Sequence, residues 1–269
     1  MKKILNAFTV LAALTFGSAV HADDISAYLQ GELIDASEVS EKLSEAGFDV
    51  IGSYVVNKKN NLKTVIFTND TLKEMAMGEG RGFAAIGRVL IDNKNEQISV
   101  SNPVYFGKAF LGDDADEDTL SEMKDALVNS FGELSDSDDL LDSDDIGDYH
   151  FMMGMPYYDD FAVIGEGSDD DLLEKASSNK NHLFTLDIGE GKKLVGLKLG
   201  KRTAKFPKKI GFQNAGVLPY TVLITNGEAR MLAPKYYLAI SYPLLTMSQF
   251  MKIATVPGAI EKDLTKVFK

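Results

Sequence analysis

Cysteine is absent from this 269-residue chain, and histidine is nearly so, with three residues. The lack of cysteine excludes disulfides, thiolate metal ligands, a cysteine nucleophile and a lipid-modified cysteine. Beyond the first 22 residues only His150 and His182 remain, and they do not form the HExxH spacing of zinc enzymes. A Gly-x-Ser-x-Gly elbow is missing as well. Since no nucleophile or base can be named, the sequence favours a protein without catalysis, and it points to no particular cofactor.

Long hydrophobic runs are also scarce, and the clearest one lies at the start. Lys2 and Lys3 precede the apolar stretch Ile4–Ala19, and Ala19-Val-His-Ala22 supplies the small residues of a cleavage site. This layout predicts a secretory signal peptide over residues 1–22, because the run is shorter than the ~20 residues of a membrane-spanning helix. We therefore expect an exported protein, soluble in the periplasm of a Gram-negative cell and without a membrane anchor.

The charge is unevenly distributed. The net charge is −12, and residues 23–180 hold 12 Lys and Arg against 35 Asp and Glu, whereas residues 181–269 hold 14 against 5. Most of the chain would repel phosphate, which argues against nucleic acid as a partner. The acidic and basic halves could instead attract each other, within one chain or in a homodimer.

Periodicity in the first half predicts a mixed order of helices and strands. Asp35 followed by Glu38 is typical of a helix start, and Gly47 of a helix end. The expected order is a helix between these residues, strands 48–56 and 62–68, a helix over 70–77, strands 83–91 and 97–100, and a closing helix from Thr119.

The second half repeats this order. Ser168 is the expected start of a helix, and Asn226-Gly227 is a strong hairpin signal. The other expected elements are strands 183–188 and 194–199, a segment 206–210 in place of the second helix, strands 218–224 and 229–232, and a closing helix containing Ile260 and Leu264.

Two segments, one in each half, align almost without a gap. RVLIDNKNEQISVSNPVYFGKAFL starts at Arg88 and TVLITNGEARMLAPKYYLAISYPLL at Thr221. Each runs strand, polar turn, strand, proline, aromatic pair and apolar tail. The predicted fold class is therefore α+β, with two tandem β-α-β-β-α-β-β units, each with a closing helix, and a mainly antiparallel sheet with helices on one face. Residues 27–133 and 161–269 form the units, and 134–160 join them.

The stretch Leu218-Pro-Tyr-Thr-Val-Leu-Ile, followed by a hairpin, resembles the end of the bacterial domain of unknown function numbered 302. The segment EKLSEAGFDVIGSYVV, from Glu41 to Val56, is similar to the opening of that family. The resemblance implies a fold but no activity. The first copy departs from it, with Ala84-Ala85-Ile86 where Leu-Pro-Tyr stands in the second.

The joining region contains an acidic stretch followed by a methionine-rich one. Residues 113–148 hold 15 acidic residues, so we expect most of this stretch outside the Thr119 helix to be a mobile linker. His150, Met152, Met153 and Met155 follow, and they could bind a soft ion such as Cu(I) or Ag(I). The alternative is an apolar plug in which methionine fills gaps.

Two further regions could contact a ligand. The aromatic and methionine residues Tyr220, Tyr236, Tyr237, Tyr242 and Met247 either fill the interface between the units or line a pocket for an apolar molecule. The basic stretch Lys192–Lys209 could hold an acidic ligand or the acidic linker, or it could be a solvated strand edge.

These observations favour a non-catalytic periplasmic binding or accessory protein that uses the cleft between two related units. Its partner would be an unidentified small molecule or protein. The alternatives are soft-metal binding through the methionine segment and an interaction scaffold that oligomerises.

Overall fold

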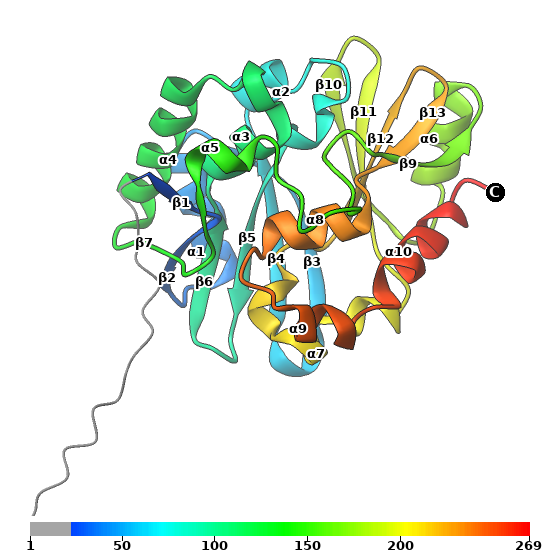
Figure 1. Cartoon of the computed structure of the whole chain (residues 1–269). Helices are drawn as coiled ribbons and strands as arrows, with labels where there is room; N and C mark the ends of the chain where they lie inside the picture. The colour runs from blue at the N-terminus through cyan, green and yellow to red at the C-terminus, as the bar shows by residue number, and fades with distance from the viewer. Residues whose placement is uncertain (1–22) are drawn as a thin grey trace, which may run out of the picture.

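Two antiparallel sheets carry the fold in the computed structural model, which describes residues 23–269 (Figure 1). The predicted signal peptide lies outside these residues. The first sheet has the order β3-β4-β5-β6-β2-β7 and the second β10-β11-β12-β13-β9. In the first sheet the strands are β2 (Tyr28–Glu32), β3 (Asp49–Asn57), β4 (Leu62–Thr68), β5 (Gly87–Asp92), β6 (Gln97–Ser101) and β7 (Ser135–Asp136). In the second they are β9 (Ala162–Glu166), β10 (His182–Gly189), β11 (Lys192–Leu197), β12 (Tyr220–Thr225) and β13 (Glu228–Met231).

The predicted α+β class with antiparallel sheets is confirmed. Five strands of each sheet also follow one order: β3-β4-β5-β6-β2 corresponds to β10-β11-β12-β13-β9. In both halves the first of these five strands along the chain pairs with the last one: β2 pairs with β6, and β9 pairs with β13. The origin of the halves by duplication stays a prediction.

Helices connect and cover the strands. They are α1 (Ala36–Glu45), α2 (Asp70–Met75), α3 (Pro103–Leu111), α4 (Glu117–Phe131), α5 (Ser143–Ile146), α6 (Asp169–Ser177), α7 (Pro207–Ile210), α8 (Pro234–Ser241), α9 (Met247–Lys252) and α10 (Val256–Thr265). Short 3₁₀ turns are η1 (Lys58–Asn60), η2 (Arg81–Ala85), η3 (Gly112–Asp114), η4 (Thr203–Lys205) and η5 (Phe212–Ala215). The predicted helix starts at Asp35 and Ser168 are confirmed, because each side chain accepts hydrogen bonds from first-turn amides.

Three sequence predictions are wrong in detail. Residues 83–85 belong to η2, and the strand predicted to begin at Phe83 begins at Gly87. The segments after Pro103 and Pro234, which had no predicted helix, form α3 and α8. Proline suits the first turn of a helix because its fixed φ is helical and its missing N–H would have no helical partner. Both helices are buried on nearly all sides, so they show no polar stripe that would reveal their period.

The segment 134–160, expected to be mostly a mobile linker, contains short strands and a helix. Its β7 pairs with β2, and β8 (Leu140–Asp142) pairs with β1 (Asp24–Ser26). The Ser26 and Ser137 hydroxyls lie 2.9 Å apart in a buried contact. Backbone pairing therefore holds the acidic segment against the first half while most of its carboxylates stay in water.

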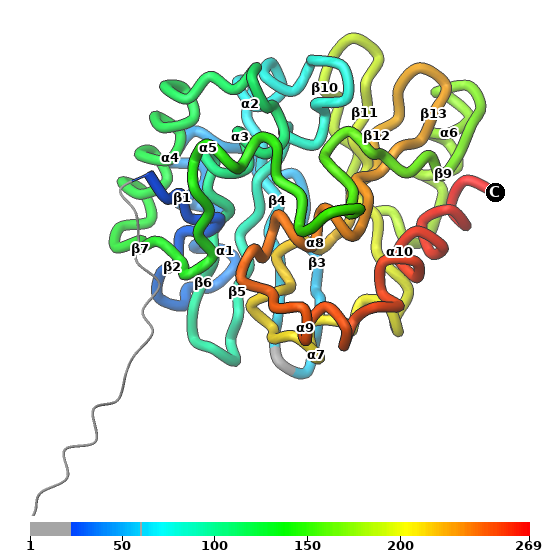
Figure 2. Tube along the Cα trace, in the orientation of Figure 1, coloured from blue at the N-terminus to red at the C-terminus, as the bar shows by residue number. Residues whose placement is uncertain are grey.

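The two halves share one apolar core across α3 and α8. The Tyr105 hydroxyl of α3 donates to the Ile240 carbonyl of α8 at 2.7 Å, and the Tyr236 hydroxyl of α8 donates to the Ala109 carbonyl of α3 at 3.1 Å. Each tyrosine stands two residues after its proline, and each acceptor six residues after the other proline. A second apolar cluster lies between the first sheet and helices α1 and α4. The junction is thus built from reciprocal contacts, and the chain can be followed through it in Figure 2.

Candidate functional site

A cleft of about 860 Å³ lies where the first half meets the second. One wall is the end of β3 with Lys58 of η1, and the other is the loop 179–181 that enters β10. The segment 198–208 with Phe212, and the end of α10 with the residues after it, complete the lining. Figure 1 locates β3, α7 and α10.

Two sheet edges meet beside this cleft. β3 and β10 are the edge strands of their sheets. A Cβ placed on Gly52 of β3 would lie 3.3 Å from the Phe184 ring of β10, so the strands approach closely there. The Phe184 ring also lies over Gly196 of β11, where any side chain would collide with it. Beyond this contact β3 runs on to Lys58 as one side of the cleft.

The charge of the cleft is almost entirely positive. Seven lining residues are lysines, namely Lys58, Lys180, Lys198, Lys201, Lys205, Lys208 and Lys266, and the one acidic lining residue is Asp263. Lys266 pairs with Asp263 at 3.3 Å. Within residues 23–269, no salt bridge includes the other six lysines. Like charges gathered around one concave surface create a positive potential that an anion would relieve.

Asp263 is already engaged by its own chain. Its Oδ2 accepts hydrogen bonds from the Gly200 amide at 3.0 Å and from the Thr203 hydroxyl at 2.6 Å. A Cβ on Gly200 would lie 2.7 Å from the same oxygen. Asp263 therefore ties the loop 200–203 to α10, and it shapes the cleft without neutralising the six lysines.

The floor of the cleft is less polar than its rim. Tyr54, Leu199, Ala204, Pro207 and Val267 are buried or nearly so and line it. Burial raises the pKa of the Tyr54 hydroxyl, which keeps that group neutral and able to donate a hydrogen bond. A ligand with a carbon skeleton and several anionic groups would match such a surface.

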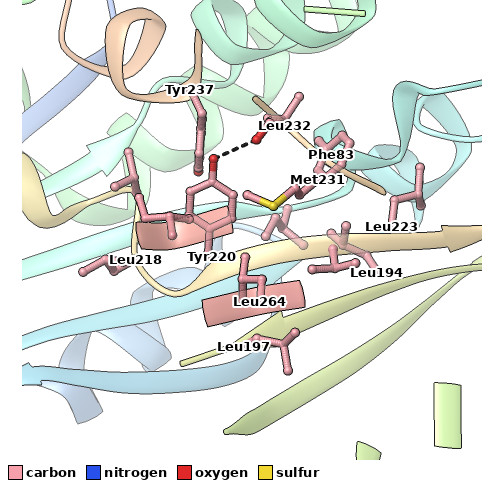
Figure 3. Close-up of a cluster of buried hydrophobic side chains, with 14 of the residues drawn as sticks. Phe83, Leu194, Leu197, Leu218, Tyr220, Leu223, Met231, Leu232, Tyr237 and Leu264 are labelled. Carbon is pink, nitrogen blue, oxygen red and sulfur yellow. Dashed lines mark hydrogen bonds between the residues drawn. The ribbon is translucent and has the colours of Figure 1, made fainter. Parts of the chain in front are cut away.

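The tyrosines predicted to contact a ligand lie in the junction and not in the cleft. Tyr220, Tyr236, Tyr237 and Tyr242 are at most 3% exposed, and none of them lines the cleft. The Tyr220 hydroxyl donates to the Leu232 carbonyl at 2.9 Å amid leucine side chains and Tyr237 (Figure 3). Burial raises the pKa of all four hydroxyls. Their surroundings match the packing alternative, while Met247 lies apart on α9 with 44% exposure.

The four residues of the predicted metal site lie on an exposed loop. His150 packs against the Tyr157 ring with centroids 4.4 Å apart. Met152 and Met153 are 46% and 95% exposed. No group of three or more His, Asp and Glu residues that could hold a metal occurs in the described chain, so a metal there would depend on the thioethers.

The sequence indicated only part of the cleft. The basic stretch Lys192–Lys209 divides: Lys192 and Lys193 pair with Glu190 and Asp187, whereas four lysines from Lys198 onward line the cleft. Lys58, Lys180 and Lys266 come from distant parts of the chain. Their positions in the sequence carry no sign of this meeting, because the fold alone brings them together.

Comparisons with protein-family models, with curated proteins and with solved structures found no match. The resemblance to the domain of unknown function therefore stays a prediction. Within residues 23–269, no helix is both long enough and apolar enough to cross a membrane. The functional argument accordingly rests on the geometry of the cleft.

Proposed function

We propose that this protein is a non-catalytic binding protein that takes a multiply charged anion into the lysine-lined cleft between its halves. The observation that carries the proposal is a cleft of about 860 Å³ lined by six lysines that form no salt bridge within residues 23–269. The predicted signal peptide supports a periplasmic location for this role.

The size and the lining favour an organic polyanion over a single inorganic ion. Ligand pockets are commonly about 300–1,000 Å³, and a lone phosphate would reach only a few of the lysines. Each exposed lysine–anion pair contributes modestly, roughly 1 kcal/mol or less. Useful affinity would therefore need several such pairs, together with contact between the ligand skeleton and the Tyr54–Leu199 floor.

A binding role also suits the absence of catalytic groups from the lining. In the part of the chain that the structure describes, the cleft lining includes no histidine or serine, and its one carboxylate is held by Gly200 and Thr203. Lysine without a partner base supplies charge and hydrogen-bond donors.

The test is calorimetric titration of residues 23–269 with inositol hexakisphosphate as a probe polyanion and with uncharged inositol as its control. The triple variant Lys198→Gln/Lys201→Gln/Lys205→Gln should weaken probe binding at least tenfold. The matched triple Lys192→Gln/Lys193→Gln/Lys235→Gln removes the same charge elsewhere and should change it less than twofold. If both triple variants weakened probe binding equally, the probe would be attracted only by the overall charge of the protein, which would contradict the proposal.

Salt gives an independent check. Raising ionic strength from about 20 to 200 mM shortens the screening length from roughly 20 to 7 Å, so probe affinity should fall steeply. An affinity that does not change with salt would indicate that the lysines do not hold the ligand.

A further inference from the structure

The loop that carries His150 and the methionines is closed by a ring contact within the loop and anchored at its end. At its start the His150 ring packs on Tyr157. At its end Tyr158 is 5% exposed, and its hydroxyl donates to the Gly80 carbonyl at 2.9 Å. The Arg81 guanidinium lies 5.1 Å from the Tyr158 ring centroid. Tyr158 is thus the residue that anchors this segment, and the methionines before it are not needed for the anchoring.

A tight turn gathers the three loop methionines. The Met155 amide donates to the Met152 carbonyl at 2.9 Å, and Gly154 has φ +79°. This is the pattern of a β-turn with glycine at its third position, where a left-handed φ is required. The Cα atoms of the first and fourth residues of such a turn are less than ~7 Å apart. Met152, Met153 and Met155 therefore occupy three of four consecutive turn positions.

A second pair of methionines lies on the neighbouring helix α9. A capping box of Thr246 and Gln249 starts this helix, and none of its residues is buried. Met247, Phe250 and Met251 have the i, i+3 and i+4 spacing of one helix face. Met247 and Met251 are 44% and 66% exposed.

One aromatic contact joins the loop to the helix. The Phe151 and Phe250 rings have centroids 4.4 Å apart. Phe151 directly precedes the turn, and Phe250 lies on the face that carries Met247 and Met251. The contact therefore brings the turn and α9 together, although the sequence places their methionines almost 100 residues apart.

Packing does not account for the exposed methionines. A gap-filling methionine is buried, whereas Met152 and Met153 are 46% and 95% exposed, and Met155 is half-buried while Tyr158 is buried below the loop. Because the chain has no cysteine, methionine is its only sulfur donor. Thioethers prefer soft monovalent ions, and Cu(I) accepts two or three sulfur ligands in open geometries. Asp148, Asp159 and Asp160 are exposed nearby and would favour the approach of a cation.

We propose that the Met152–Met155 turn and the Met247/Met251 face of α9 bind one soft monovalent cation, Cu(I) or Ag(I), with His150 as an additional nitrogen donor. This site uses neither the lysines nor the space of the anion cleft. Cation binding is a second function, and it is tested independently of anion binding in the cleft.

The test is anaerobic titration of residues 23–269 with Cu(I) in competition with a chromophoric chelator, together with native mass spectrometry in the presence of Ag(I). We expect one bound ion per chain. Met152→Leu/Met155→Leu should weaken Cu(I) binding at least 100-fold, and Met247→Leu/Met251→Leu at least tenfold. Leucine keeps apolar volume at these positions, so thermal unfolding should not change.

The matched control is Met75→Leu/Met77→Leu, which removes two half-buried thioethers elsewhere and should leave Cu(I) affinity unchanged. The proposal is wrong if no Cu(I) binds at micromolar concentration, or if binding survives replacement of all five methionines by leucine. It is also wrong if only the loop pair matters, because the site would then not include α9. Binding of inositol hexakisphosphate by the same variants should stay as in the wild type, which separates a failure here from a failure of the cleft.

Discussion

The two halves use one topology, but the equivalent connections between their strands differ. In the first half the β4–β5 connection carries α2 and η2, and Met77 at its centre packs against Gly189 of β10, with Sδ 3.3 Å from a Cβ placed there. In the second half the β11–β12 connection carries η4, α7 and η5 and leaves a cleft beside β3. The first connection is closed against the neighbouring sheet edge by a side chain, and the second borders an open cleft.

The two connections differ in charge as well as in shape. The closed connection, residues 69–86, holds Asp70, Glu74 and Glu79 beside two basic residues, whereas the open connection, residues 198–219, is basic with no acidic residue. The shared core contacts of Tyr105 and Tyr236 show no such divergence. Two halves can therefore keep a common core while their connecting loops differ in shape and charge, because loops tolerate change that packed interiors do not.

The largest effect should come from breaking the reciprocal contacts. Tyr105→Phe and Tyr236→Phe each leave a buried carbonyl unpaired, which should lower the free energy of unfolding by about 1–3 kcal/mol in each variant. Urea denaturation measures this, with exposed Tyr157→Phe as the control. Losses that differ by more than about twofold would mean that the two contacts are equivalent in geometry but not in energy.

Charge reversal tests whether shape or charge separates the two connections. Lys205→Glu/Lys208→Glu places two carboxylates at the open cleft and should weaken binding of inositol hexakisphosphate about 100-fold. The mirror change Glu74→Lys/Glu79→Lys gives the closed connection positive charge and should create no new site, because Met77 packs this connection against β10. A second binding event in that variant, seen by calorimetry, would show that shape is not what separates the two connections.

The segment 134–160 has no counterpart in the second half, and it brings a pH-dependent contact to the junction. Burial raises the pKa of Asp139 to about 6, against a partial opposing effect of the Leu244 amide. The folded state therefore holds this proton more tightly than the unfolded state, and the associated stability is complete below about pH 4 and lost as pH rises through about 6.

Asp139→Asn should consequently be more stable than the wild type at pH 7.5, by about 1–2 kcal/mol, since asparagine keeps an acceptor without the buried charge. The difference should shrink towards zero at pH 4. Thermal melts of both proteins across this range measure it, and a constant difference would rule out titration of Asp139 as the cause.

The smallest expected effect concerns the one carboxylate of the open cleft. Asp263→Asn removes a negative charge from the lysine surface and should raise affinity for inositol hexakisphosphate two- to fivefold. It should also lower stability slightly, because a charge-assisted hydrogen bond to Thr203 is lost. Lower affinity would mean that the position of the loop 200–203 matters more than the charge of the cleft.

Local chemistry explains why much of the fold could be predicted. Asp35 and Ser168 cap helices where their side chains suggested, and Asn226-Gly227 turns the hairpin between β12 and β13. Most strands lie within two residues of the ranges predicted from the sequence. The same reasoning failed at α3 and α8, since a helix buried on all sides has no polar face to mark its period.

The sequence by itself determined the caps, the turns, most strands, the uneven charge and the matching order of elements in the two halves, because each depends on residues near one another in the chain. Long-range packing instead determines which connection borders the open cleft and which lysines line it. Lys58 and Lys266 line one cleft, and Phe151 meets Phe250, because the folded chain brings distant segments together. Side-chain identity states what a residue can bind, but long-range packing determines what it can reach.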